Sequence, residues 1–142
     1  MKKEKNNNKR FEDLTLLQKS ETKFPDSPDK ASLETFENLF KKRDYEITLN
    51  CPEFTSLCPV TGQPDFGDIT ITYVPDKLCI ESKSLKIYLF SFRNHNTFHE
   101  EAVNTILDEV MAKCAPRKAE VTGVFRPRGG IALTIKADYK KK

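Results

Sequence analysis

Hydrophobic and polar residues alternate in several short stretches of the chain, with the two-residue period of β-strands. Tyr45–Leu49 alternates in this way, and Asp68–Val74 places isoleucines and a tyrosine on one face and threonines on the other. Pro75 and Asp76 form a turn signal, and the short run Lys77–Glu81 follows it. We therefore expect a strand at 45–49 and an antiparallel hairpin that pairs 68–74 with 77–81.

Two later segments have the three- and four-residue spacing of amphipathic helices. In the first helix, which Ser84 can cap, the apolar stripe consists of Leu85, Tyr88, Leu89 and Phe92. The second helix opens at Thr97 and stops at Pro116, and its apolar face carries Val103, Ile106, Leu107, Val110, Met111 and Cys114. The spacing therefore predicts two consecutive helices.

A second hairpin follows the helices, with strands at Glu120–Phe125 and Ile131–Ala137 joined through Arg126–Gly130. The element order β-β-α-α-β-β predicts an α+β fold, with two helices on one face of an antiparallel sheet. A body of about 100 residues leaves the other, partly apolar face of the sheet to be buried by self-association.

The length of 142 residues favours one domain. We expect a polar, flexible N-terminal extension at 1–28 and one domain at 29–142, with its core at about 44–139. The net charge of +3 misrepresents that domain, because residues 1–10 carry +4 and Lys140–Lys142 carry +3. The remaining 129 residues therefore sum to −4. An RNA-binding module should have a basic body, so we expect no direct nucleic-acid partner.

The chain contains no apolar run of about 18 residues, and no apolar segment follows its charged start. We therefore expect a cytoplasmic protein without membrane contact. Its four cysteines include no C-x2-C pair, which argues against a zinc site. A disulfide framework is also not expected in a cytosolic chain of this length, so the question is whether one cysteine is reactive.

The segment Asn50–Gly67 contains three prolines and is predicted to be a long loop, and such loops in compact domains are often functional. It carries Cys58, followed by Pro59, and Asp65 seven residues later. A thiolate can attack an electrophile while a nearby acid manages the proton. Taken alone, such a cysteine is more often a small buried apolar residue and such an aspartate more often a turn residue.

Four segments, in the same order, resemble the 7-cyano-7-deazaguanine reductases. They are Phe54–Phe66 (FTSLCPVTGQPDF), Glu81–Tyr88 (ESKSLKIY), Phe98–Glu100 (FHE) and Arg128–Gly130 (RGG). The resemblance spans roughly 44–139, and its one departure is Ile87, where the signature usually has leucine or tyrosine. It implies a tunnelling fold (T-fold) whose subunits assemble into rings. The expected partner is a second copy of the chain, in a decamer of two pentamers with active sites between subunits.

The resemblance also implies the reaction, a four-electron reduction of the nitrile of 7-cyano-7-deazaguanine to the 7-aminomethyl compound in tRNA queuosine biosynthesis. NADPH would serve as co-substrate, two molecules per turnover, and no metal would be needed. Cys58 matches the nucleophile, which forms a covalent thioimide, and Asp65 matches the proton donor. Covalent addition converts a poor hydride acceptor into an imine-like one.

The binding residues follow from the same matched segments. Those implied for the substrate are Ile80, Glu81, Ser82, His99 and Glu100. Those implied for NADPH are Lys83, Ser84 and Lys86, since lysines and a hydroxyl at a helix start can hold phosphate. Arg126 and Arg128 are secondary candidates for the 2′-phosphate. No G-x-G-x-x-G follows a strand, so a Rossmann site is not expected.

Two alternatives remain from the residues themselves. Thr97-x-x-Glu100 is also a capping box, in which the glutamate would close its own helix instead of binding substrate. The T-fold also hosts zinc-dependent cyclohydrolases that open GTP, and a metal set drawn from Cys51, Cys58, His95 and His99 is conceivable. These positions lack the ligand spacing of that class, so we expect no metal.

Overall fold

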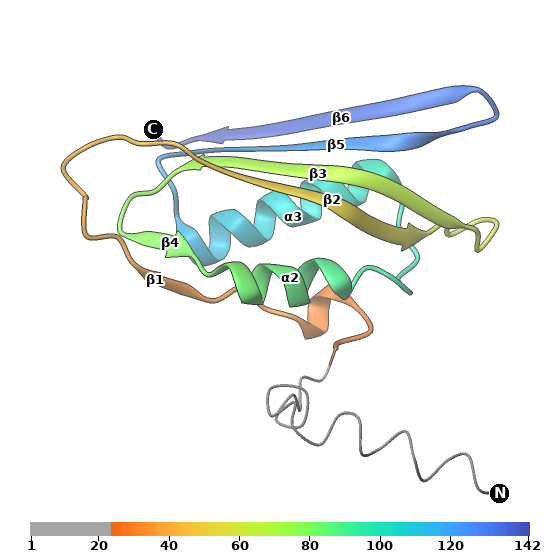
Figure 1. The fold of residues 1–142 in the computed structure, drawn as a ribbon, viewed down its shortest axis with the longest axis horizontal. Helices are drawn as coiled ribbons and strands as arrows, with labels where there is room; N and C mark the ends of the chain where they lie inside the picture. The colour runs from red at the N-terminus through yellow and green to blue at the C-terminus, as the bar shows by residue number, and fades with distance from the viewer. Residues whose placement is uncertain (1–23) are drawn as a thin grey trace, which may run out of the picture.

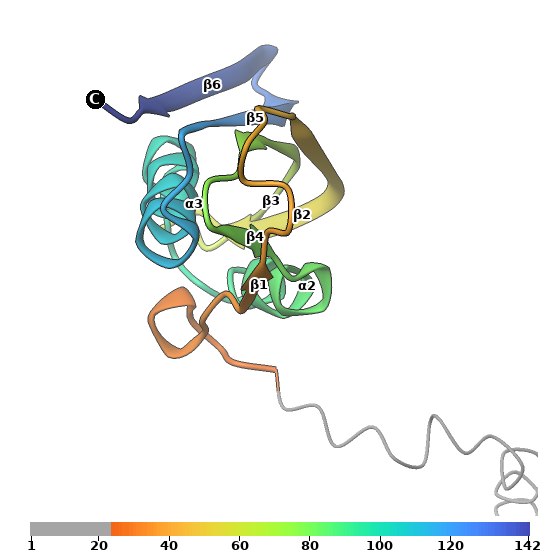
Figure 2. The same cartoon turned by 90° about the vertical axis from the view of Figure 1, so that its left-hand side faces the viewer.

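A four-stranded antiparallel sheet, covered on one face by two helices, forms the body of the molecule (Figures 1 and 2). The computed structural model describes residues 24–142. The strands occur in the order β2-β3-β5-β6 and span Ile47–Leu57, Pro64–Val74, Lys118–Arg128 and Ile131–Lys140. The helices are α2 (Ser82–Phe90) and α3 (His99–Cys114). Within this sheet, two strands precede the helices and two follow them, which is the predicted order; two further short strands also precede the helices.

The predicted hairpin between 68–74 and 77–81 is wrong. β3 pairs with β2 on one edge and with β5 on the other, so neither edge is open to a further strand. The short β4 (Leu78–Ile80) instead pairs with β1 (Thr35–Glu37) in a separate two-stranded sheet. Three residues after a turn could not compete with the two 11-residue strands that flank β3.

The predicted long loop at 50–67 is also wrong, because β2 continues through Leu57 and β3 begins at Pro64. Only residues 58–63 connect them. The β2–β3 register shifts between Cys51 and Phe54, which lets Pro52, with no N–H to donate, remain in the strand. The three prolines suggested a loop, but Pro52 lies at the bulge of β2 and Pro64 is the first residue of β3.

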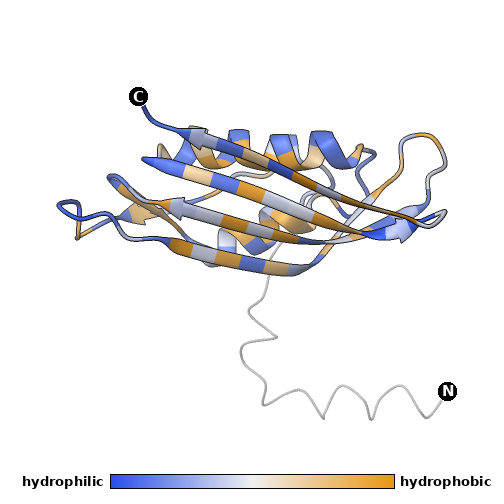
Figure 3. Ribbon diagram, turned by 90° about the horizontal axis from the view of Figure 1, so that it is seen from above, coloured by the Kyte–Doolittle hydropathy of each residue, from blue (hydrophilic) through white to orange (hydrophobic). Residues whose placement is uncertain are grey.

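The core lies between the sheet and the helices, as the alternation of apolar and polar residues along the strands in Figure 3 indicates. It contains the predicted apolar face of 68–74 and the stripes of both helices, including Ile69, Ile71, Tyr73, Leu85, Tyr88, Val103, Ile106 and Val110. Gly123 of β5 allows α3 to approach closely, since a Cβ there would lie 2.7 Å from Val103 Cγ2. Packing of α3 on β5 thus depends on this glycine.

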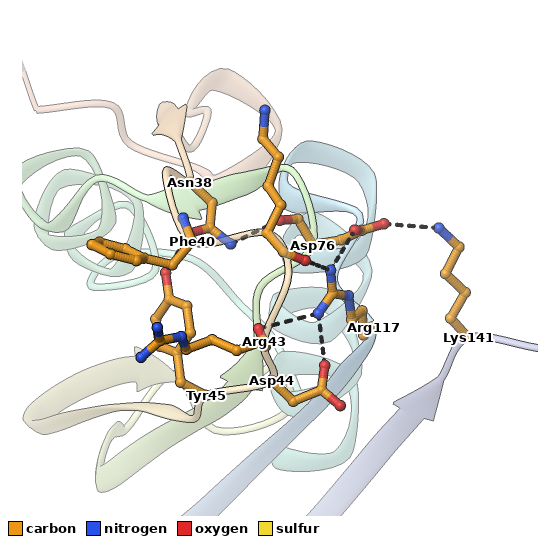
Figure 4. Close-up of polar contacts among 9 residues, drawn as sticks. Asn38, Phe40, Arg43, Asp44, Tyr45, Asp76, Arg117 and Lys141 are labelled. Carbon is orange, nitrogen blue, oxygen red and sulfur yellow. Dashed lines mark hydrogen bonds and ion pairs between the residues drawn. The ribbon is translucent and has the colours of Figure 1, made fainter.

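Arg117, in the connection from α3 to β5, fastens the segment that leads into β2 (Figure 4). Its guanidinium donates to Asp44 Oδ1 at 2.6 Å and to Asp76 Oδ1 at 3.2 Å, and also to the backbone carbonyls of Lys41 and Arg43. Buried Asn38 adds a bond from its amide to the Asp76 carbonyl at 2.8 Å. The start of the sheet is therefore tied to the far end of α3.

The N-terminal segment is described only from Phe24, so most of the predicted extension at 1–28 lies outside the described residues. The Phe24 ring packs against the Phe90 ring of α2, with centroids 4.3 Å apart. A single 3-10 turn, η2 (Pro28–Lys30), follows, and Pro28 is buried. Over residues 24–142, neither helix is long and apolar enough to cross a bilayer.

Candidate active site

A tight turn between β2 and β3 presents Cys58. The Cys58 N–H donates to the Gln63 carbonyl at 2.9 Å, and the Gly62 N–H donates to the Cys58 carbonyl at 2.8 Å. Gly62 adopts φ +69°, a left-handed conformation that glycine takes without strain. This short turn gives Cys58 a defined position at the end of β2.

The start of α3 lies beside this turn because the segment before it pairs with β2. The Leu57 N–H donates to the His95 carbonyl, and the Thr97 N–H donates to the Leu57 carbonyl, both at 3.0 Å. His99 and Glu100, the first residues of α3, follow directly. These backbone bonds hold the FHE segment next to the end of β2, where Cys58 follows Leu57.

Asp65, the second residue of β3, is only 4% exposed and lies between two cationic or ionisable side chains. Its Oδ1 accepts from Arg128 Nη1 at 2.7 Å. Its Oδ2 lies 3.2 Å from His99 Nε2, an approach without the alignment of a hydrogen bond. The His99 ring stacks on Phe125 with centroids 3.9 Å apart, which orients it toward Asp65.

Ser56 is a buried residue of this site that the sequence reasoning missed. It stands opposite Asp65 in the β2–β3 register, so both side chains point to the helix-covered face. Within residues 24–142, its Oγ and His99 Nε2 are the two buried side-chain atoms that lack a hydrogen-bond partner. A buried polar atom without a partner is rare and often marks a ligand or water position.

The turn also makes Cys58 a stronger acid than an ordinary thiol. Hydrogen bonding from the Thr61 side chain, then from the backbone N–H groups of Thr61 and Val60, lowers the pKa of Cys58 to about 7, with a smaller contribution from Arg128. By contrast, burial raises the pKa of Cys51. Since the thiolate is the nucleophilic form, Cys58 is the half-buried cysteine suited to attack near neutral pH.

The capping box proposed for Glu100 is not formed. The N-cap of α3 is Phe98, without a side-chain capping bond, so the helix begins at His99 and not at Thr97. The Thr97 hydroxyl donates to the Phe98 carbonyl at 3.1 Å. The Glu100 side chain is exposed. Its carboxylate is therefore not committed to closing α3.

Glu81, and not Ser84 as predicted, caps α2. Its carboxylate accepts from the backbone N–H groups of Lys83 and Ser84, each at 2.7 Å, and these bonds lower the pKa of Glu81. A longer side chain one position before the helix reaches both free N–H groups. Ser84 is buried inside the helix, where its hydroxyl donates to the Glu81 carbonyl and accepts from the Glu34 N–H.

The remaining predicted residues lie elsewhere. Ile80 is buried in the core, and its N–H donates to the Tyr73 hydroxyl at 2.8 Å. Ser82 and Lys86 line a groove of about 480 Å³ between β2 and α2, and Lys83 is exposed outside it. The groove also contains Arg93, a cation that the sequence analysis did not single out. Its volume is that of a small-molecule site.

The structure thus separates the predicted residues into two groups. Asp65 and His99 are in contact near the end of β2, where Cys58 begins the turn and Glu100 directly follows His99, whereas Ser82 and Lys86 belong to a groove whose lining includes none of these four. Among residues 24–142, no three histidine, cysteine or acidic side chains cluster as metal ligands.

Comparison with known proteins decides the family. A family profile described as QueF-like protein matches residues 64–142, more than half of the chain. The chain belongs to the QueF-like family. A protein of Streptococcus mutans is 52% identical over 129 residues, covering 91% of this chain and 80% of its own length, and one of Bacteroides fragilis is 53% identical, covering 90% and 84%. Both are named NADPH-dependent 7-cyano-7-deazaguanine reductase. The family predicted from the four sequence segments is therefore confirmed.

A solved structure of this family type shares the fold. The archaeosine synthase QueF-Like, in the apo form, superposes with a TM-score of 0.61 at 20% identity, covering 70% of this chain and 95% of that one. At this identity the likeness concerns the fold alone. It confirms the predicted α+β T-fold, while the ring assembly stays a prediction.

Proposed function

We propose that this chain is an NADPH-dependent oxidoreductase that reduces the nitrile of 7-cyano-7-deazaguanine to the 7-aminomethyl compound, a step of tRNA queuosine biosynthesis. The observation that carries the proposal is Cys58, a thiol with a pKa lowered to about 7, held beside buried Asp65. The names of relatives at 52–53% identity support the same reaction.

Cys58 and Asp65 have complementary roles in the proposed reaction. The thiolate adds to the nitrile carbon, and the nitrogen gains a proton, which gives a thioimide. NADPH supplies one hydride in each of two steps, two molecules per nitrile. After the first hydride reaches the carbon, the C–S bond breaks, the thiolate leaves and an imine remains. The second hydride and a proton then give the amine. Asp65, in contact with the His99 ring, is placed to deliver protons to the nitrogen.

The substrate would bind through the start of α3. Glu100 offers an exposed carboxylate that can accept from the ring N–H and the exocyclic amine of a guanine-like edge. His99, the preceding residue, stacks on Phe125 and lies 3.2 Å from Asp65. We assign the substrate edge to Glu100 and His99, and the nitrile end to Cys58.

The cofactor fits the groove between β2 and α2. Lys86 and Arg93 provide cations for phosphate, Ser82 provides a hydroxyl, and the apolar side chains of Phe54 and Phe90 provide surface for a ring. Lys83 is exposed on the adjacent first turn of α2 and is kept as a contact from outside the groove. The Ser84 hydroxyl bonds within the chain, which makes it the weakest of the predicted contacts.

Separation of the groove from Cys58 supports a homo-oligomer, the predicted decamer of two pentamers. One chain holds nucleophile and acid at the end of β2, and its groove lies elsewhere on its surface. A neighbouring copy that brings its α2 start to this site would supply Glu81 and Ser82 to the substrate. In such an assembly Glu81 would act while it still caps α2.

The test is NADPH oxidation on addition of 7-cyano-7-deazaguanine, followed by absorbance. Wild type should consume two NADPH per nitrile, and Cys58→Ala should lose turnover by roughly 10³-fold or more. Cys79→Ser, which replaces a buried thiol that lines neither the Cys58 turn nor the groove, is the matched control and should retain activity. Without NADPH, a nitrile adduct should appear by mass spectrometry on wild type and Cys79→Ser, and not on Cys58→Ala. Nitrile binding without NADPH oxidation in wild type would refute the reductase assignment.

A further inference from the structure

Arg128, the last residue of β5, contacts both the turn that carries Cys58 and the acid Asp65. One nitrogen, Nη1, donates to Asp65 Oδ1 at 2.7 Å. The other, Nη2, reaches Thr61 Oγ1 at 3.5 Å and also donates to Gln63 Oε1. A single guanidinium therefore bridges two turn side chains and the buried carboxylate.

The backbone of β5 directs this side chain to the site. The β5–β6 register shifts between Phe125 and Arg128, and Gly129 and Gly130 follow with φ of +58° and +81°. Arg126, only two residues earlier, pairs with Asp68 at 3.4 Å and is 57% exposed, against 37% for Arg128. The bulge and the glycine turn thus separate two arginines with different surroundings.

We propose that Arg128 is a positioning residue that holds the Cys58 turn against Asp65 and so sets the spacing of nucleophile and acid. This inference rests on the proposed function. The planar guanidinium can donate in two directions at once, which a lysine ammonium cannot reproduce with the same geometry. Thr61 and Gln63 are exposed turn residues, and the bond from the Gln63 N–H to Thr61 Oγ1 at 3.3 Å stays within the turn, so Arg128 supplies the link from their side chains to Asp65.

Charge balance gives a second reason for the arginine. Arg128 brings one positive charge into contact with both groups, since it pairs with Asp65 at 2.7 Å and also contacts the Cys58 side chain. A cation beside a thiol favours its thiolate form. A hydrogen bond that the guanidinium donates to Cys58 is the first cause of the raised pKa of Arg128, and Arg128 in turn helps to lower the pKa of Cys58.

The competing assignment is a cofactor contact through the 2′-phosphate. Both terminal nitrogens of Arg128 already bond within the chain, to Asp65 and Gln63. These contacts favour the positioning role, and the KM for NADPH separates the two assignments.

The experiment compares Arg128→Gln, Arg128→Lys and the matched control Arg126→Gln. The first readout is the pH dependence of Cys58 exchange with a small aromatic disulfide, which needs neither substrate nor cofactor. The second is the rate of nitrile adduct formation without NADPH, and the third is the KM for NADPH. Urea unfolding of each variant shows that it is folded.

For Arg128→Gln we expect the midpoint of the pH dependence of disulfide exchange to rise. Nitrile adduct formation should be slower than in wild type by at least about tenfold, and the KM for NADPH should stay within about twofold of the wild-type value. Arg128→Lys should restore the midpoint better than the adduct rate, because it returns charge but not the bridge. Arg126→Gln should match wild type in the two readouts that need no cofactor, disulfide exchange and adduct formation. An unchanged adduct rate with a KM for NADPH raised tenfold or more would assign Arg128 to the cofactor and overturn the proposal.

The two proposals fail separately. If wild type forms no nitrile adduct and oxidises no NADPH, the proposed function is wrong. Disulfide exchange at Cys58 would still report on Arg128, and a midpoint that Arg128→Gln leaves unchanged would overturn the positioning role.

Discussion

The acidity of Cys58 should depend on one exposed hydroxyl. The Thr61 side chain is the first cause of the lowered pKa of Cys58, ahead of two backbone N–H groups and Arg128. Thr61→Val removes the hydroxyl and keeps the β-branched shape, and Thr61 is exposed, so folding should be little affected. We expect the ionisation midpoint of Cys58 to rise from about 7.

The size of the effect depends on the pH of the measurement. For each pH unit that the midpoint rises, the thiolate fraction at pH 7 falls from about one half to about one tenth. The nucleophilicity of each thiolate increases about threefold over the same change, since the Brønsted coefficient is about 0.4–0.5. The variant should therefore exchange about twofold more slowly at pH 7 and about threefold faster near pH 10.

This crossing of the two pH–rate profiles is the expected signature. The assay is exchange with a small aromatic disulfide from about pH 5 to pH 10, with the rate of Cys58→Ser subtracted for the other thiols. Thr70→Val, on the helix-free face of β3, is the matched control and should overlay wild type. A Thr61→Val profile that overlays wild type at every pH would refute the hydrogen-bond explanation of the lowered pKa.

Further predictions concern pH dependence and stability. Turnover should rise with pH through about 7, because Cys58 is a nucleophilic thiolate above its pKa and an unreactive thiol below it. A turnover rate that does not change between about pH 5 and pH 8 would contradict this. Gly123→Ala would force a Cβ within 2.7 Å of Val103, so urea unfolding should show a loss of about 1–3 kcal/mol, whereas a stability equal to wild type would refute the close approach of α3. The Tyr45 hydroxyl donates to the amide oxygen of buried Asn38 at 2.6 Å, and Asn38→Ala removes this acceptor. The substitution should lower the free energy of unfolding by about 1–3 kcal/mol. An unchanged free energy of unfolding would show that the buried amide is dispensable.

Local periodicity correctly predicted the strand at 68–74, both helices and the hairpin near 120–137. A side-chain period depends only on the geometry of one element, so it can be read without knowing the neighbours. The four segments that gave the family are likewise continuous in the sequence. Cys58 and Asp65 could be singled out because they share one segment, and a six-residue turn was short enough to keep them together.

Strand pairing and helix capping needed the tertiary structure. β4 pairs with β1 and not with β3, and β2 continues through Pro52 to Leu57, because hydrogen bonds with distant partners outweigh local turn propensity. Glu81 caps α2 in place of Ser84, since only the folded chain shows which side chain reaches the free N–H groups.

The sequence by itself determined the family and the order of elements in the main sheet, and it predicted Cys58 as nucleophile and Asp65 as acid. Only the tertiary structure decided that Ser56, His99 and Arg128, from β2, α3 and β5, meet at Asp65. The physical reason is that such contacts depend on strand register and bulge position to within a single residue. A shift of one residue in β5 would turn Arg128 to the other face of the sheet, and no local pattern records that choice.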